Sequence, residues 1–303
     1  MQLPENALFK NRQGGQEVYT GRQLNDASEA NYSRVGDDGR IWETQFLGGY
    51  QEGQEPGLLV GYKFDGIYRS PDDIPADLVV KTGNAVGKYQ YGPAAYAKLT
   101  DAQKANALQL QPGDAKWADV NGDGVIDVYD QVKIGNTMPR WTGGLNSTLR
   151  WKGLSLYARF DFAFDFWTYD GALPWFLGDM QGTYNMTTDV ADTWSADNPG
   201  AKYPRYTFAD QLGTGNYYLT STLFAHRGDY CAMRELSLTY AMPKSITEKL
   251  AMQNLELSLT GQNLGYIFAP PVATPERVYG GGTASGTGYP MPRTVILGVN
   301  VTF

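Results

Sequence analysis

The last twelve residues of the chain alternate between apolar and small or polar side chains. Counting back from the carboxy-terminus, every second position is apolar: Phe303, Val301, Val299, Leu297 and Val295. A period of two with one apolar face predicts a β-strand. A soluble sheet can produce this pattern. An apolar face that ends on an aromatic carboxy-terminus is also typical of the closing strand of an outer-membrane barrel, with Phe303, Val301, Val299 and Leu297 as its insertion signal.

A long hairpin is predicted in the middle of the chain. The segment Trp141–Trp151 alternates, and Lys152-Gly153 then forms a tight turn, because glycine tolerates a positive φ. Every second residue from Leu154 to Phe166 is apolar, and Arg159, Asp161 and Asp165 lie on the opposite face. Such a face is too long for most soluble strands and fits a tilted strand that crosses a membrane.

Further segments follow the same rule. Leu58–Arg69 and Leu255–Thr260 alternate clearly, and residues 40–50 do so weakly. Between Tyr230 and Tyr240 the parity slips, which predicts a β-bulge near Arg234-Glu235 that keeps both charged side chains off the apolar face. Counted from the carboxy-terminus, the pattern gives about seven antiparallel strands.

The connections between these strands are very unequal in length. Lys152-Gly153 is short and residues 241–254 are modest, with a helical turn expected from Pro243. In contrast, residues 1–39, 70–139, 169–228 and 269–291 are long, irregular and rich in Gly, Pro, Asp and Tyr. Alternation of short and long connections is typical of a barrel with short periplasmic turns and long outer loops.

The predicted fold is therefore all-β, a partial transmembrane β-barrel with long extracellular loops. We expect residues 1–39 to be an extracellular loop region. Residues 40–303 should supply the barrel strands, with extracellular loops at 70–139, 169–228 and 269–291. Because bacterial barrels have even strand numbers and open edges are not viable in lipid, the strands should belong to a larger barrel.

Composition narrows the class of protein. The chain has 303 residues, of which 19% are charged and 13% aromatic, and no apolar run approaches the ~18 residues of a transmembrane helix. The net charge of −7 argues against a nucleic-acid partner. A single cysteine, Cys231, excludes an internal disulfide. No signal peptide opens the chain, so an exported protein would be processed or a carboxy-terminal piece of a longer one.

The segment Asp119–Asp130 has the spacing of a calcium loop. Gly124 stands at the sixth position, where the loop turns sharply, and an aspartate replaces the usual glutamate at the twelfth, as in dockerin-type loops. The predicted ligands are Asp119, Asn121, Asp123, the carbonyl of Val125, Asp127 and Asp130. We expect a structural Ca²⁺ that orders a long loop, and an acidic, glycine-rich turn without metal is the alternative.

No arrangement of residues predicts an enzyme. His226 is the only histidine, and Asp161 and Asp165 are expected to form a solvated wall. The stretch Tyr279–Gly288 lacks the strand and helix of a phosphate-binding loop. Between Tyr169 and Tyr218 the chain is dense in aromatic residues, which either stack on a substrate or pack the loop. The candidate substrate contacts are Trp175, Trp194, Tyr203 and Tyr206.

With the strands and the loop identified, the sequence resembles the carboxy-terminal part of SusC/RagA-type TonB-dependent outer-membrane transporters over about 250 residues. The similar blocks occur in the family's order: GLLVGYKFDGIYRS (Gly57–Ser70), Gly113–Phe162, MRELSLTYAMPKS (Met233–Ser245), LSLTGQNLGYI (Leu257–Ile267) and PMPRTVILGVNVTF (Pro290–Phe303).

This resemblance implies a barrel of about 22 strands closed by a plug. It implies a location in the cell outer membrane, in contact with its lipid. It further implies a SusD-like surface lipoprotein as partner and TonB-driven import of oligosaccharide or peptide cargo. The plug and the TonB-contacting segment are absent from this chain, so the chain alone is expected to be inactive. The alternative is a secreted, soluble β-protein that binds carbohydrate and carries a dockerin-like calcium loop.

Overall fold

A computed structural model describes residues 10–13, 16–19, 33–35, 39–43, 55, 57–82, 87–179, 185–272, 275–278, 283–284 and 291–303. The chain divides into two compact units. Residues 137–168 and 226–303 form one, which we call the sheet unit, and residues 1–136 and 169–225 form the other, the loop unit. Each unit is described by itself.

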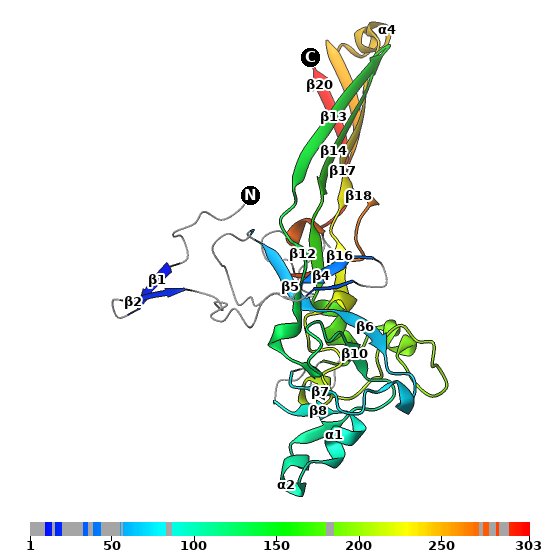
Figure 1. The fold of residues 1–303 in the computed structure, drawn as a ribbon. Helices are drawn as coiled ribbons and strands as arrows, with labels where there is room; N and C mark the ends of the chain where they lie inside the picture. The colour runs from blue at the N-terminus through cyan, green and yellow to red at the C-terminus, as the bar shows by residue number, and fades with distance from the viewer. Residues whose placement is uncertain are drawn as a thin grey trace. The chain divides into compact units, whose positions relative to one another are not determined.

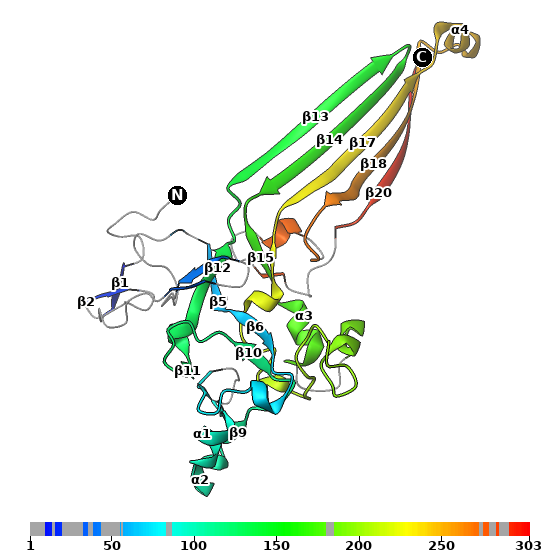
Figure 2. The same ribbon diagram turned by 45° about the vertical axis from the view of Figure 1, so that its right-hand side comes forward.

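The sheet unit is built on one antiparallel sheet of five strands (Figures 1 and 2). In spatial order the strands are β13 (Trp141–Trp151), β14 (Leu154–Phe164), β17 (Tyr230–Ala241), β18 (Asn254–Phe268) and β20 (Thr294–Thr302). Each strand pairs with the next along the sheet, and β13 and β20 form its edges. The all-β fold class and the strands predicted over these segments are confirmed.

The short connections of this sheet have the predicted form. Lys152 and Gly153 join β13 to β14 with φ values of 45° and 84°, so both central residues of the turn adopt the left-handed conformation that a type I′ hairpin requires. Between β17 and β18 lie α4 (Lys244–Thr247) and η8 (Glu248–Leu250), which form the helical turn expected from Pro243.

Strand register keeps the apolar positions of all five strands on one face. Leu149 pairs with Leu156, Leu156 with Leu238, and Leu238 with Leu259, which in turn pairs with Leu297. Because side chains alternate across a sheet, these residues share a face. Between β14 and β17 the register shifts where Arg159 pairs with Glu235 and Phe160 with Met233. The predicted bulge at Arg234-Glu235 is thereby confirmed.

The loop unit consists of short strands and helical turns around a separate core. Strand β5 (Leu58–Tyr62) pairs with β12 (Gln131–Asn136), and β6 (Phe64–Ile67) pairs with β10 (Ala115–Trp117). A four-stranded sheet has the order β11 (Val125–Ile126), β7 (Val79–Val80), β8 (Tyr89–Tyr91), β9 (Ala107–Gln109). Two short helices, α1 (Pro93–Ala97) and α2 (Asp101–Lys104), separate β8 from β9 along the chain.

The remaining elements are short. Two small hairpins pair β1 (Lys10–Gln13) with β2 (Gln16–Tyr19) and β3 (Ser33–Val35) with β4 (Ile41–Glu43). The other elements are η2 (Pro71–Asp73), η3 (Val128–Asp130), β15 (Trp167–Asp170), α3 (Ala172–Pro174), η4 (Trp175–Asp179), η5 (Thr188–Asp192), η6 (Asp210–Leu212), η7 (Thr222–Phe224), β16 (Ala225–Arg227), η9 (Pro275–Val278) and β19 (Thr283–Ala284). Among the described residues, no helix is both long and apolar enough to span a bilayer.

The strand predicted over Leu58–Arg69 is wrong as a barrel strand. It is split into β5 and β6, and its aromatic side chains Tyr62 and Tyr68 are buried in the core of the loop unit. Their neighbours there include Ile74, Leu78, Val80, Leu110, Trp117, Ile126 and Leu219. The apolar face of this segment therefore meets a protein interior. Of the weakly patterned segment 40–50, residues 41–43 form β4 and residues 44–50 lie outside the described chain.

Gly61 in β5 tests how tightly the loop unit is packed. A Cβ atom at this position would lie 2.4 Å from the backbone oxygen of Thr220, which cannot move aside easily. We predict that Gly61→Ala lowers the free energy of unfolding by about 1–3 kcal/mol, because overpacking strains a close-packed interior. At Gly200 an added Cβ meets nothing within 4 Å, and its φ is not positive. The control Gly200→Ala should stay within about 0.5 kcal/mol of the parent in thermal unfolding. Equal effects of the two variants would contradict this packing.

Candidate functional site

The apolar face of the five-stranded sheet is an unusual surface for a folded chain. Its side chains are not covered by any described part of the chain: Leu297 is 80% exposed, Phe303 78%, Trp141 69% and Trp151 69%. Soluble monomers rarely expose contiguous apolar surface of this kind. The residues predicted as an insertion signal, Phe303, Val301, Val299 and Leu297, all lie at its β20 edge, and all except Val301 are exposed.

The opposite face of the same sheet is polar. Arg159, Glu235 and Gln262 follow one another across β14, β17 and β18, and the hydroxyls of Ser237 and Thr260 are 2.7 Å apart. The bulge residue Arg234 forms ion pairs with Asp161 and with Glu276, the latter at 3.0 Å. The bulge therefore places this guanidinium where carboxylates compensate its charge.

The two acids considered for catalysis have structural partners. Asp161 forms an ion pair with Arg234. Asp165 forms ion pairs with Arg140 at 3.5 Å and with Arg227 at 3.3 Å. His226 lies in β16 and is half-buried. Cys231 is a free cysteine, and its place in the register puts it on the apolar face. Both acids thus hold ion pairs within the sheet unit.

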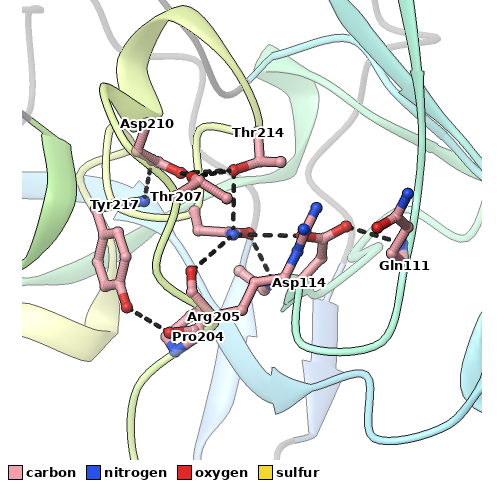
Figure 3. Close-up of polar contacts among 10 residues, drawn as sticks. Gln111, Asp114, Pro204, Arg205, Thr207, Asp210, Thr214 and Tyr217 are labelled. Carbon is pink, nitrogen blue, oxygen red and sulfur yellow. Dashed lines mark hydrogen bonds and ion pairs between the residues drawn. The ribbon is translucent and has the colours of Figure 1, made fainter. Parts of the chain in front are cut away.

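A polar network in the loop unit fixes residues 204–217 (Figure 3). At its centre the buried carboxylate of Asp114 accepts hydrogen bonds from Arg205 Nε at 2.6 Å, Asn216 Nδ2 at 3.3 Å and the Gln111 backbone N–H at 2.8 Å. Asn216 Oδ1 in turn accepts from the backbone N–H of Ala115. A buried carboxylate is tolerated only with such partners.

Asp210 belongs to the same network and is fully buried. Its carboxylate accepts from the hydroxyls of Thr207 at 3.0 Å and Thr214 at 2.6 Å and from the Tyr217 N–H at 2.8 Å (Figure 3). All these donors are neutral, so burial outweighs them and raises the pKa of Asp210 above its ordinary value.

The predicted aromatic contacts fall into two groups. Tyr203 is 4% exposed and stacks on Phe224 within a core cluster, so it cannot meet a substrate. Trp194 is half-buried, and its ring lies against Gly113, where an added Cβ would be 2.4 Å from Trp194 Cε3. Trp175 and Tyr206 are exposed. Tyr184, in the same aromatic stretch, lies outside the described residues.

Phe208 was missed by the sequence reasoning, although it lies in the aromatic stretch. It is 67% exposed, more than any of the four predicted contacts. The one-turn segments η4, which carries Trp175 and Phe176, and η6 pack against each other, and Tyr206 lies beside Gly178 of η4. The exposed side chains of Trp175, Phe176, Tyr206, Phe208 and Leu212 therefore come from one region, which we call the aromatic patch.

The predicted calcium loop is closed by its own hydrogen bonds. Asp119 accepts from the N–H groups of Gly122 and Gly124, and Asp123 accepts from Val125. Both glycines have a positive φ, 78° and 79°, as the sharp turns require. The residues predicted as the first three ligands therefore shape the loop, and their side-chain oxygens are the type of ligand atom that Ca²⁺ prefers.

Asp130 has a different place from the other predicted ligands. It is fully buried, and its two oxygens accept from the N–H groups of Val120 at 2.8 Å and Asp127 at 2.9 Å. Burial raises its pKa to about 6. Asp127 caps η3 through the Tyr129 N–H. Within the described residues no group of three or more His, Cys, Asp or Glu side chains converges so that it could hold a metal ion.

Comparisons with known proteins show which proteins this chain is similar to. No protein-family model matches the sequence. Two curated relatives do, both from Formosa agariphila. TonB-dependent receptor P3 is 28% identical over 271 residues, and TonB-dependent receptor P26 is 27% identical over 264. The matches cover 86% and 83% of this chain but only 23% of each relative. The chain thus spans about a quarter of the length of these relatives.

Solved structures of similar fold also match this chain. The RagAB peptide transporter matches 87% of this chain and 26% of the matched chain, with a TM-score of 0.56 and 18% identity. The RagAB peptide importer in its closed-closed state covers 95% of this chain and 26% of the matched chain, with a TM-score of 0.51 and 17% identity. The predicted resemblance to TonB-dependent transporters is confirmed by these relatives, and the solved structures share the predicted all-β fold.

The buried carboxylate of Asp210 makes stability depend on pH. Because its pKa is raised in the folded state, the fold holds a proton that the unfolded chain has already lost, so Asp210 contributes most at low pH. That contribution is lost as the pH rises through the folded pKa. We predict that Asp210→Asn becomes progressively more stable relative to the parent as the pH rises from 4.5 to 8. Thermal unfolding of both proteins across this range measures it, and parallel curves would contradict it.

Proposed function

We propose that this chain is the carboxy-terminal barrel segment of a TonB-dependent outer-membrane transporter that imports glycans or peptides together with a SusD-like lipoprotein. The relatives are named as receptors and transporters, which is consistent with a protein that is not an enzyme. The observation that carries the proposal is the exposed apolar face of the five-stranded sheet.

Strand length and polarity support a position in the membrane. The strands of the sheet run from 9 to 15 residues, and a tilted strand of about 9–11 residues crosses a bilayer. On this proposal the apolar face contacts the lipid of the cell outer membrane. The polar face, with Arg159, Asp161 and Glu235, then lines the water-filled lumen. A soluble carbohydrate-binding protein has no use for the uncovered apolar face.

The rest of such a transporter would correspond to the parts of the relatives that lie outside the matched region. Because the relatives are about four times as long as the matched region, their remaining parts would supply the other strands, the plug and the contact with TonB. We expect the segment to be inactive alone, since an open sheet cannot enclose a lumen.

The aromatic patch is our candidate for the surface that meets cargo or the lipoprotein. Of the four predicted substrate contacts, Trp175 and Tyr206 are exposed and belong to this patch. The exposed Phe208 belongs to it as well. Large rigid aromatic side chains gain affinity at a low entropic cost, and the Asp114 network holds the segment that carries two of them. A peptide is the cargo named for the RagAB structures, and an oligosaccharide is the other class that aromatic rings bind.

We further propose that Asp119–Asp130 closes on a structural Ca²⁺ through Asp119, Asn121, Asp123, the Val125 carbonyl, Asp127 and Asp130, which requires that these side chains, not convergent in this structure, draw together around the ion. The oxygen-only donor set and the two positive-φ glycines support this. The ion would neutralise carboxylates that now repel one another around Asp130, whose pKa Asp119 helps to raise.

The lipid contact is tested by a charge on the apolar face. We predict that Leu297→Arg lowers the stability of the sheet in lipid vesicles by about 2–4 kcal/mol, because a cation near the middle of the bilayer is poorly solvated. Urea unfolding of the complete barrel that contains this segment, folded into vesicles, measures the effect. The matched control is Asn300→Arg, on the polar face of the same strand, which should be nearly neutral. Equal effects, or a parent chain that stays monomeric and folded in plain buffer, would contradict the membrane location.

Calcium binding is tested by thermal unfolding with and without the ion. If the dissociation constant is about 1 mM, as in many extracellular sites, 10 mM Ca²⁺ should stabilise the loop unit by about 1.4 kcal/mol. We predict that Asp119→Asn and Asp123→Asn each abolish this stabilisation. Asp72→Asn, an exposed acid in η2 outside the loop, should retain it. A calcium response that survives in Asp119→Asn would place the ion elsewhere.

A further inference from the structure

A cavity of about 490 Å³ lies at the β13–β14 turn. It is lined by residues from both faces of the sheet. Trp151 and Leu154 belong to the apolar face, and Arg150, Ser155, Thr239 and Glu256 belong to the polar face. The cavity therefore lies at the rim of the sheet, where the two faces meet. A molecule that fills it needs both an apolar and a polar part.

The charges around this cavity are arranged as two cations and one carboxylate. Arg150 ends the polar face of β13, and Lys152 in the turn holds its ammonium 5.0 Å from the centre of the Trp151 ring. Glu256 lies on β18, which is separated from β13 by β14 and β17. Within the described part of the chain neither Arg150 nor Glu256 forms an ion pair, although both line the same cavity.

Uncompensated charges of opposite sign at two ends of one cavity select a zwitterionic ligand. A guanidinium and an ammonium bind a phosphodiester through charge-assisted hydrogen bonds, and the guanidinium fork matches phosphate geometry. A carboxylate at the other end binds a primary ammonium in the same way. Trp151, 69% exposed on the apolar face, offers a surface for hydrocarbon next to these charges.

We propose that this cavity binds the headgroup of an ethanolamine phospholipid, with the phosphate at Arg150 and Lys152, the ammonium at Glu256 and the acyl chains along Trp151 and Leu154. The inference rests on the proposed function, because it places the apolar face in lipid. An anionic lipid without the amine fits less well, since its headgroup leaves the carboxylate of Glu256 unpaired. A choline headgroup fits less well because its ammonium has no N–H to donate.

The experiment measures which lipids stay bound to the full chain in detergent micelles. The chain is mixed with phosphatidylethanolamine, phosphatidylglycerol or phosphatidylcholine of identical acyl chains, and bound lipid is counted by native mass spectrometry. We expect phosphatidylethanolamine to be retained most. Arg150→Gln should weaken its retention about tenfold, the typical cost of one charge-assisted hydrogen bond. Glu256→Gln should keep phosphate binding and lose the preference for ethanolamine over glycerol.

Two controls and a soluble probe make the result decisive. Arg159→Gln and Glu235→Gln change the same residue types on the same polar face away from the cavity, and both should retain lipid like the parent. Circular dichroism verifies that every variant keeps its sheet. Glycerophosphoethanolamine, which lacks acyl chains, should bind far more weakly, and equal binding of it would overturn the assignment to a lipid.

Equal retention of the three lipids, or full retention by Arg150→Gln, would overturn the site while leaving the membrane location intact. A chain that stays folded in buffer and never enters micelles would overturn the proposed function together with this inference. The two failures are therefore distinguishable, because micelle entry is recorded before any lipid is counted.

Discussion

The sheet unit depends on one constraint, the phase of side-chain alternation across five strands. A slip of one residue in any pairing would move the apolar set of that strand to the opposite face. The bulge opposite Arg159-Phe160 shows how the constraint is met, since β17 holds an extra residue there. With it, Leu236 and Met233 lie on the same face despite their odd spacing, and Arg234 reaches Asp161 on the polar side. The continuous apolar face, and every function proposed for it, follow from that register.

Local signals were sufficient for the elements whose partners are near in sequence. The Lys152-Gly153 hairpin, the bulge and the five strands could all be predicted, because alternation and turn chemistry are properties of adjacent residues. The same signal failed at Leu58–Arg69, since alternation reports only that one face avoids water. It does not distinguish lipid from a protein core. Tyr62 packs against Trp117 in such a core, and Tyr68 is buried in the same cluster.

The candidate sites divide in the same way. The calcium loop is contained in twelve residues, so its spacing alone predicted the turns that Asp119 and Asp123 stabilise. The ion pair between Asp114 and Arg205 joins residues 91 positions apart in the sequence, so no local sequence pattern predicts it. Aromatic density likewise predicted where rings gather but could not separate buried Tyr203 from exposed Tyr206, because that difference is decided by packing against Phe224.

The polar network around Asp114 fixes the backbone that carries part of the aromatic patch. A segment that folded only for its own stability would turn Phe208 and Tyr206 inward, as it does Tyr203 and Tyr217. Instead, residues 204–217 are held by buried polar contacts to Asp114 and Asp210, which fix the backbone without using the rings of Tyr206 and Phe208. Rings left outside on a fixed backbone lose little entropy when a partner covers them. The two buried carboxylates therefore fix the backbone of the surface that we propose meets cargo or the lipoprotein.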